Sequence, residues 1–198
     1  METKTYTVYK FNELQDDQKE KAIENLRDIN VEYEWYDYSF DDYKAIAKIL
    51  GINIDKIYFS GFCSQGDGLC FEGSFQYAKG WKRELTTYAG EVTENKNNKE
   101  IHALGQQLQE LQRQAFYGVY GTVKQRGHYQ HSGCTSFSLD HDEYREFDDE
   151  DFKQAYRELM DTFYHMLRKE YEYLTCDEAV IETIKCNDYN FDENGKIA

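Results

Sequence analysis

Proline is absent from this chain of 198 residues, whereas glycine occurs 13 times. Glycine must therefore make the tight turns, because it adopts positive φ angles at little cost. Long apolar runs are also lacking, and none approaches the ~18–20 residues that a membrane span needs. The first residues form a charged, β-like segment, so the sequence predicts no signal peptide and no membrane partner.

Basic residues are scarce: 23 Lys and Arg stand against 38 Asp and Glu, for a net charge of −15. This balance excludes a general nucleic-acid binder, because phosphate contacts need clustered Lys and Arg. Two partners remain compatible, namely a basic protein surface and a small anionic ligand held locally. Charge alone does not choose between them, because an acidic surface also serves solubility.

The five cysteines are an odd number in a chain without a secretion signal, which predicts reduced thiols in a cytoplasm. A zinc site can be drawn from Cys63, Cys70, His128, His131 and Cys134. However, the spacing lacks a Cys-x-x-Cys pair, and residues 128 and 131 point to opposite faces of a flat strand. We therefore predict no metal and no cofactor.

Aromatic residues are abundant, with eighteen tyrosines and twelve phenylalanines, which is enough for a substantial core. We find no repeat and no low-complexity linker, and we predict a single domain over 1–198. A homodimer remains open, because the long aromatic helix near the C-terminus could carry a second apolar stripe.

Apolar periodicity predicts an α+β fold. Alternation indicates a strand at 4–10, two hairpins at 57–77 and 119–139, and an edge strand at 188–191. Helical spacing predicts helices at 12–30 with Asn12 as cap, after Ser39 up to Gly51, at 101–115, 152–174 and 177–185. Residues 91–99 are expected to form a mobile loop. We predict a largely antiparallel sheet of about five strands, with helices packed on one face.

Two polar segments rich in glycine, 60–68 and 126–133, connect the strands of the two hairpins. Plain connectors would need only two to five residues. In the first segment, backbone N–H groups at 65–68 could form an anion nest, with Gln65 reading a base edge and Asp67 or Glu72 binding ribose hydroxyls. The candidate residues are Ser64, Gln65, Gly66, Asp67 and Glu72. The alternative is a wide turn with a solvent-facing glutamine.

The second segment places a guanidinium, two imidazoles and a phenol within six residues of an acidic protein. Arg126 suits phosphate, Tyr129 stacks on planar groups, and His128 and His131 can donate to an anion. Ser132 completes this set. The alternative is that both histidines are structural. Nothing matches a known nucleophile signature, so whether the protein is an enzyme stays uncertain, and we favour binding without turnover. A phosphodiesterase that uses both histidines is a less favoured alternative.

A second feature, segment 32–42, interleaves acids with rings, as a surface for a basic partner would. Its candidate residues are Trp35, Tyr36, Asp37, Asp41 and Asp42. The other interpretation is that these rings cap the core. The acidic connector 140–151 is similarly ambiguous, since charge runs are usually solvated faces.

Several motifs resemble a family of phage and prophage proteins that is often labelled an antitoxin of a toxin–antitoxin stability system. They are YFSGF (58–62), SQGDG (64–68), FEG (71–73), GHY (127–129), HSGCT (131–135), EYEY (170–173) and the tail 187–195. The resemblance implies a phage context and action in the cytoplasm of an infected bacterial host. It carries no catalytic residues. Cys63 stands where the family would be expected to have a smaller residue such as serine, which further weakens the zinc interpretation.

Together these observations predict an anti-defence protein that binds and sequesters a nucleotide-derived host immune signal at the two loops. The alternative is an acidic inhibitor or antitoxin that occludes a basic host protein through segment 32–42.

Overall fold

The computed structural model describes residues 7–89, 96–143 and 145–198 and is α+β. It divides into two compact units, which we describe separately. The larger unit is Asp37–Arg168, and the smaller comprises the chain up to Tyr36 together with Lys169–Ala198. The helix α5 (Asp149–Leu174) contributes residues to both units. Whether 1–198 behaves as one domain therefore stays a prediction.

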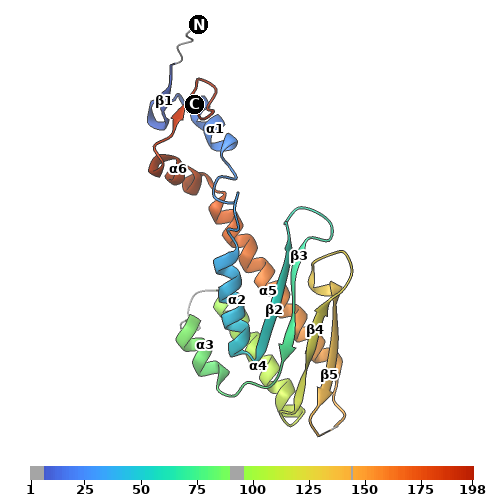
Figure 1. Cartoon of the computed structure of the whole chain (residues 1–198). Helices are drawn as coiled ribbons and strands as arrows, with labels where there is room; N and C mark the ends of the chain where they lie inside the picture. Colours follow the sequence, from blue (N-terminus) through green and yellow to red (C-terminus); the bar gives the residue numbers. More distant parts are fainter. Residues whose placement is uncertain (1–6, 90–95, 144) are drawn as a thin grey trace. The chain divides into compact units, whose positions relative to one another are not determined.

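The larger unit contains a four-stranded antiparallel sheet, seen in Figure 1. Its strands are β2 (Ile52–Ser60), β3 (Gly68–Phe75), β4 (Val119–Gln125) and β5 (Thr135–His141), adjacent in that order. Both predicted hairpins are confirmed, although β2 begins at Ile52 rather than Ile57. Because all neighbouring strands are antiparallel, the β2–β3 and β4–β5 loops lie at the same end of the sheet.

Helices cover one face of this sheet and bury its alternate residues. They are α2 (Asp37–Ile49), α4 (Lys96–Gln114) and the first part of α5, while α3 (Trp81–Ala89) packs against α2 and α4. On α5, Phe163 stacks on Tyr43 of α2 with ring centres 4.5 Å apart, and Tyr156 packs on Phe75 of β3 at 4.3 Å. Burial raises the pKa of Tyr156 far above its ordinary value. Aromatic packing thus fixes α5 to α2 and to the sheet.

Helix α3 was not predicted. Two of its apolar residues, Trp81 and Leu85, are buried, four positions apart on one face. Trp81 packs over Gly105 of α4, where an added Cβ would lie 2.4 Å from the indole ring, and donates a hydrogen bond to Gln109 at 3.1 Å. The expected loop at 91–99 lies partly outside the described residues, and α4 already begins at Lys96.

In the smaller unit, β1 (Tyr9–Lys10) pairs with β6 (Asn190–Phe191) in a separate two-stranded sheet. The predicted first and last strands therefore pair with each other, which leaves four strands in the main sheet rather than about five. The helix expected at 12–30 is shorter: α1 spans Asp16–Asn25, and a 3-10 turn, Phe11–Glu13, includes the expected cap residue Asn12. Residues 4–6 of the expected first strand lie outside the described part.

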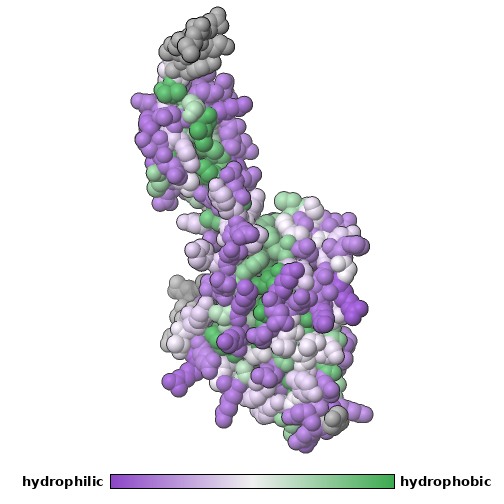
Figure 2. Space-filling view, in the orientation of Figure 1, coloured by the Kyte–Doolittle hydropathy of each residue, from purple (hydrophilic) through white to green (hydrophobic). Residues whose placement is uncertain are grey.

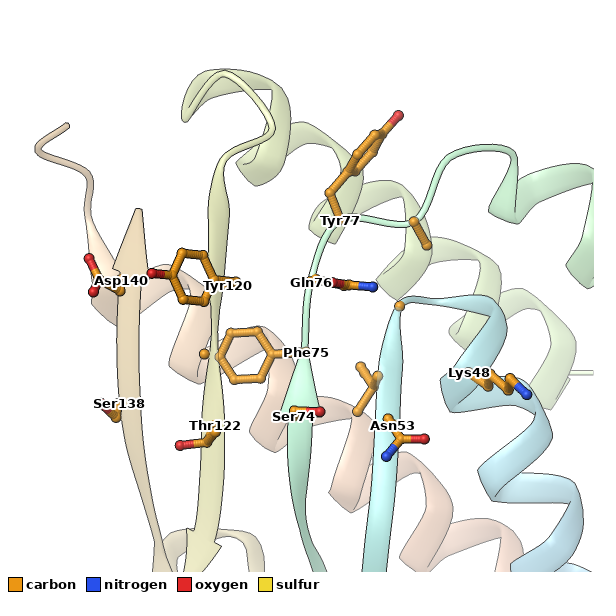
Figure 3. Close-up of a pocket in the computed structure, with 14 residues that line it drawn as sticks. Lys48, Asn53, Ser74, Phe75, Gln76, Tyr77, Tyr120, Thr122, Ser138 and Asp140 are labelled. Carbon is orange, nitrogen blue, oxygen red and sulfur yellow. The ribbon is translucent and has the colours of Figure 1, made fainter. Parts of the chain in front are cut away.

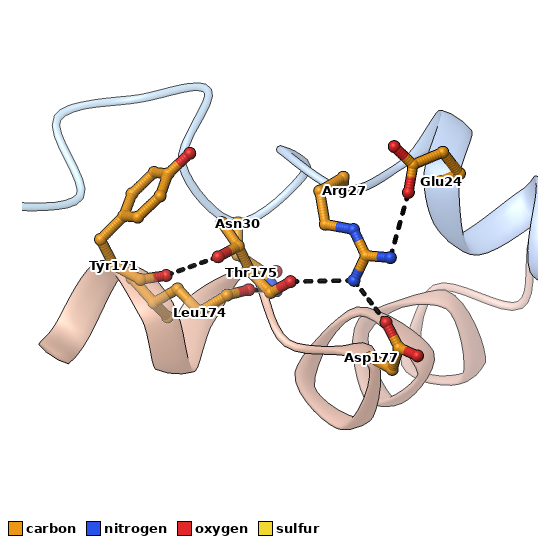
Figure 4. Close-up of polar contacts among 7 residues, drawn as sticks. All are labelled: Glu24, Arg27, Asn30, Tyr171, Leu174, Thr175 and Asp177. Atoms are coloured by element: carbon orange, nitrogen blue, oxygen red, sulfur yellow. Dashed lines mark hydrogen bonds and ion pairs between the residues drawn. The ribbon is translucent and has the colours of Figure 1, made fainter. Parts of the chain in front are cut away.

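Polar contacts join α1 to α6 (Asp177–Cys186) in this unit, as Figure 4 shows. The Arg27 guanidinium donates to the Thr175 carbonyl at 3.1 Å and pairs with Asp177 and Glu24. These two carboxylates raise the pKa of Arg27, Asp177 having the larger effect. Beneath these contacts lies a small core: Phe11, Leu14, Ala22, Ile23, Val180, Ile184 and Phe191.

Hydrophilic residues dominate the visible face of each unit in Figure 2, with hydrophobic ones between them. This surface agrees with the net charge of −15. Among the described helices, none has the length and apolar character needed to cross a membrane.

Candidate functional site

The β2–β3 loop, residues 61–67, is closed by one of its own carboxylates. Asp67 Oδ2 accepts hydrogen bonds from the backbone N–H groups of Cys63 at 2.9 Å and Ser64 at 2.7 Å. The Asp67 N–H in turn donates to the Ser64 carbonyl at 3.0 Å. Asp67 thus occupies the place at these two amides that an external anion would take. This geometry gives Asp67 a structural role that the anion-nest interpretation did not anticipate.

Aromatic contacts fix the start of the same loop to α5. Phe62 stacks on Tyr164 with ring centres 5.4 Å apart, and the Tyr164 hydroxyl donates to the Gly61 carbonyl at 3.2 Å. Burial, and to a lesser extent the Asp67 carboxylate, raises the pKa of Tyr164. Ser64 and Gln65 remain exposed at the tip. The loop is therefore anchored at its base and open at its tip.

The β4–β5 loop is held by the strand that precedes it. The side-chain amide of Gln125 donates to the carbonyls of Gly127 at 3.0 Å and Tyr129 at 3.1 Å. Arg126 donates through its backbone N–H to the Cys134 carbonyl at 2.7 Å and through Nε to Ser136 Oγ at 2.9 Å. Arg126, His128 and Tyr129 remain exposed. The side chains of these three residues are therefore accessible to solvent.

The two loops touch each other, which is the arrangement the sequence predicts. Gly66, with φ of 95°, lies against the Tyr129 ring, and a Cβ added there would be 2.3 Å from Tyr129 Cδ1. A Cβ added at Gly68 would be 2.6 Å from the His131 Cα. Both glycines are therefore required for the close approach of the loops. The role of these residues in binding a ligand stays a prediction.

Beneath this contact lies the thiol of Cys70, which is fully buried. Burial raises its pKa to about 12, and the nearby Cys134 adds to the effect. His131 Nε2 lies 3.5 Å from Cys134 Sγ, and the His131 ring stacks on Tyr129 at 6.1 Å. All five cysteines are free, and in the described part of the chain no three His, Cys, Asp or Glu side chains form a group that could hold a metal ion.

A feature that the sequence analysis missed lies on the exposed face of the sheet. The register places Asn53 beside Ser74, Ser74 beside Thr122, and Thr122 beside Ser138, so one exposed residue from each strand forms a continuous row. Figure 3 shows this row, with Tyr120 and its cross-strand neighbour Asp140 in the next one. A cavity of about 760 Å³ lies over these residues. We call it the sheet-face pocket.

One wall of the sheet-face pocket is supported by a strained corner before β4. Tyr77 lines the pocket and packs on Tyr117, with ring centres 4.6 Å apart. Tyr117 and its neighbour Phe116 have φ angles of 65° and 54°, a conformation that L-residues adopt at a cost. Arg145 lies over the Phe116 ring at 4.1 Å. Aromatic contacts thus accompany the strain at both positions.

Of the remaining candidate residues, Glu72 is half-buried on β3 opposite Lys56, and Ser132 accepts a hydrogen bond at its carbonyl from Thr135 at 2.6 Å. Neither contact tests the ligand-binding role predicted for these residues.

The alternative partner surface is divided between the two units. In the smaller unit, Trp35 is half-buried against Tyr36 and Tyr171, with ring centres 5.7 and 5.8 Å away. In the larger unit, Asp37, Asp41 and Asp42 are exposed on α2, and Asp42 accepts a 2.7 Å hydrogen bond from the Tyr88 hydroxyl. The acidic connector 140–151 runs into the first turn of α5, where acids favour helix formation.

The comparison with family models gives one match, a domain of unknown function (DUF8835), over residues 35–177. The chain belongs to the DUF8835 family. The matched segment contains the whole larger unit, and with it both loops and the sheet-face pocket. Comparisons with curated proteins and with solved structures gave no match.

Proposed function

We propose that this DUF8835 protein binds a small nucleotide-type ligand at its two contacting loops and holds it without turnover. From the resemblance to phage and prophage proteins, we further propose that it is phage-encoded and sequesters a nucleotide-derived immune signal in the infected host cell. The packing of Tyr129 onto Gly66 supports the proposal most directly, because it brings both loops together. Arg126, His128 and His131 then place one guanidinium and two imidazoles on the β4–β5 loop of a chain of net charge −15.

In this proposal the β4–β5 loop provides most of the recognition. Arg126, held through Nε by Ser136, binds phosphate with its terminal N–H groups. Tyr129, which is 55% exposed, stacks on a base, while His128 and His131 donate hydrogen bonds. Gln65 on the opposing tip reads a base edge. Since Asp67 occupies the amides of Cys63 and Ser64, phosphate binds at the Arg126 side.

Isothermal titration against a panel of cyclic dinucleotides and ADP-ribose derivatives tests this function. We expect at least one ligand to bind, and Arg126→Ala or Tyr129→Ala to weaken binding about tenfold or more, which is ~1.4 kcal/mol. Lys124→Ala is the matched control, because it removes one exposed positive charge at the end of β4, two residues before Arg126. Absence of heat with every ligand, or an equal loss in the control, contradicts the proposal. Chromatography after titration should recover intact ligand, whereas cleaved product would favour the phosphodiesterase.

A second candidate function is the occlusion of a basic host protein. It is favoured by Tyr38, which is 88% exposed, together with Asp41 and Asp42 at positions i+3 and i+4 on the same face of α2. Pull-down from host lysate should then give a salt-sensitive complex that Asp37→Asn with Asp41→Asn weakens. His128→Ala with His131→Ala should leave this complex intact. The reverse pattern would contradict this candidate and favour the loops.

A further inference from the structure

The sheet-face pocket is a second site, formed by residues other than those of the two loops. Its floor is the row Asn53, Ser74, Thr122 and Ser138, which crosses all four strands. These side chains are short, so the floor is low, and hydroxyl and amide groups both donate and accept hydrogen bonds. The floor therefore suits a ligand that carries hydroxyl groups.

Rings and one carboxylate complete the pocket. Tyr120 is 45% exposed and lies beside Asp140 on the neighbouring strand, with its ring directed toward Asp140 in Figure 3. Tyr77 lines the pocket near the end of β3. A tyrosine ring offers an apolar face to the C–H groups of a sugar ring, and a carboxylate accepts strong hydrogen bonds from its hydroxyls.

The charges around the pocket narrow the ligand class. Lys48 is the only cation and Asp140 the only acid among the lining residues. A ligand with several phosphates needs clustered cations, so this lining does not fit one. The volume of about 760 Å³ lies within the range of small-molecule sites, which is roughly 300–1,000 Å³. We infer that the sheet-face pocket binds an uncharged sugar ring, presented either by a neutral oligosaccharide or by a nucleoside.

The test uses the ¹⁵N-labelled full chain, titrated separately with maltotriose, an N-acetylglucosamine trimer and adenosine. Concentrations reach about 10 mM, which detects dissociation constants near 1 mM, or ~4 kcal/mol. We expect saturable shifts at the amides of Ser74, Gln76, Thr122 and Ser138. Shifts with an oligosaccharide alone identify a glycan, and shifts with adenosine alone identify a nucleoside. Absence of saturable shifts with all three probes, or shifts confined to the β4–β5 loop, overturns the inference.

Variants make the test specific to the pocket. Tyr120→Ala should weaken binding at least fivefold, and Thr122→Val, which keeps the shape but loses the hydroxyl, should do the same. Thr122→Ser should restore binding, and Tyr38→Ala serves as the control for an exposed tyrosine of the same unit. Tyr129→Ala should leave this binding unchanged, which separates the pocket from the two-loop site. Wild-type affinity in both Tyr120→Ala and Thr122→Val, with dispersed amide spectra, overturns the inference.

Discussion

The two hairpin loops at one end of the sheet are held in shape by different interactions. In the β2–β3 loop, the charged carboxylate of Asp67 turns inward and binds the amides of Cys63 and Ser64. In the β4–β5 loop, the neutral amide of Gln125 binds two carbonyls, and the charged Arg126 stays outside. A charged residue engaged with its own backbone is no longer available to a ligand. If the proposed function holds, this difference places ligand recognition mainly on the β4–β5 loop.

The largest expected effect is a difference in thiol alkylation between the exposed Cys63 and the buried Cys70. Cys63 is exposed in the β2–β3 loop, whereas the pKa of buried Cys70 is raised from an ordinary 9.0 to about 12. At pH 8 the Cys70 thiolate is thus roughly a thousandfold less populated than for an unperturbed thiol. We expect iodoacetamide to modify Cys63 and leave Cys70 unmodified, as measured by mass spectrometry of peptides.

The same raised pKa has a defined effect on stability. Because the fold favours the protonated thiol, Cys70 contributes its full stabilisation below about pH 9, and this contribution is lost as pH rises through about 12. If iodoacetamide modified Cys70 at pH 8 as fast as Cys63, the burial of the Cys70 thiol would be contradicted.

Replacing glycine by alanine tests the contact between the loops. Gly66 and Gly127 have similar φ angles of 95° and 93°, but a Cβ at 66 meets the Tyr129 ring, while one at 127 meets nothing within 4 Å. Both variants carry the same backbone cost of ~1–2 kcal/mol. Gly66→Ala should lose about 2 kcal/mol more in urea unfolding, because of overpacking. In a protein that also carries Tyr129→Ala, the additional loss from Gly66→Ala should disappear. If Gly66→Ala and Gly127→Ala lowered the free energy of unfolding equally, the contact between Gly66 and Tyr129 would be contradicted.

Asp67→Asn measures the carboxylate that closes the β2–β3 loop. We expect the free energy of unfolding to fall by about 2 kcal/mol, since two hydrogen bonds to a charged acceptor are weakened. Asp161→Asn, at an exposed acid on α5, is the control and should change stability by less than about 0.5 kcal/mol. Similar values for the two variants would mean that Asp67 does not order its loop.

Gln125→Ala should have the smallest effect, about 1 kcal/mol, because the bonds it removes are neutral and partly exposed. The measurement is again urea unfolding, with Gln154→Ala on α5 as the control for an exposed glutamine. If Gln125→Ala lowered the free energy of unfolding more than Asp67→Asn does, the neutral contacts of the β4–β5 loop would be more stabilising than the charged contacts of the β2–β3 loop.

The sequence predicted those helices and strands that show a clear apolar periodicity within their own segment. Alternation located both hairpins, and helical spacing located α4, α5 and α6. It missed α3, where the buried Trp81 and Leu85 give a short apolar pattern, and it extended α1 across the 3-10 turn at Phe11–Glu13.

The candidate sites were predictable to different degrees. The antiparallel order of the strands brings the two loops to the same end of the sheet, and their glycines were visible in the sequence. The hydrogen bonds of the Asp67 carboxylate to its own loop could not be predicted, because the same residues suit either a turn or an anion nest. The sheet-face pocket depends on register: Asn53, Ser74, Thr122 and Ser138 are far apart in the chain and meet only when four strands pair.

The corner at Phe116 and Tyr117 has a consequence for variation within the DUF8835 family. Its left-handed backbone favours glycine or asparagine, yet this chain keeps an aromatic ring at 117 to support Tyr77. Relatives that retain the pocket wall should keep a ring there despite the conformational cost, whereas relatives that have lost it are free to replace the ring. We therefore predict that the residue at this position separates family members with this pocket wall from members without it.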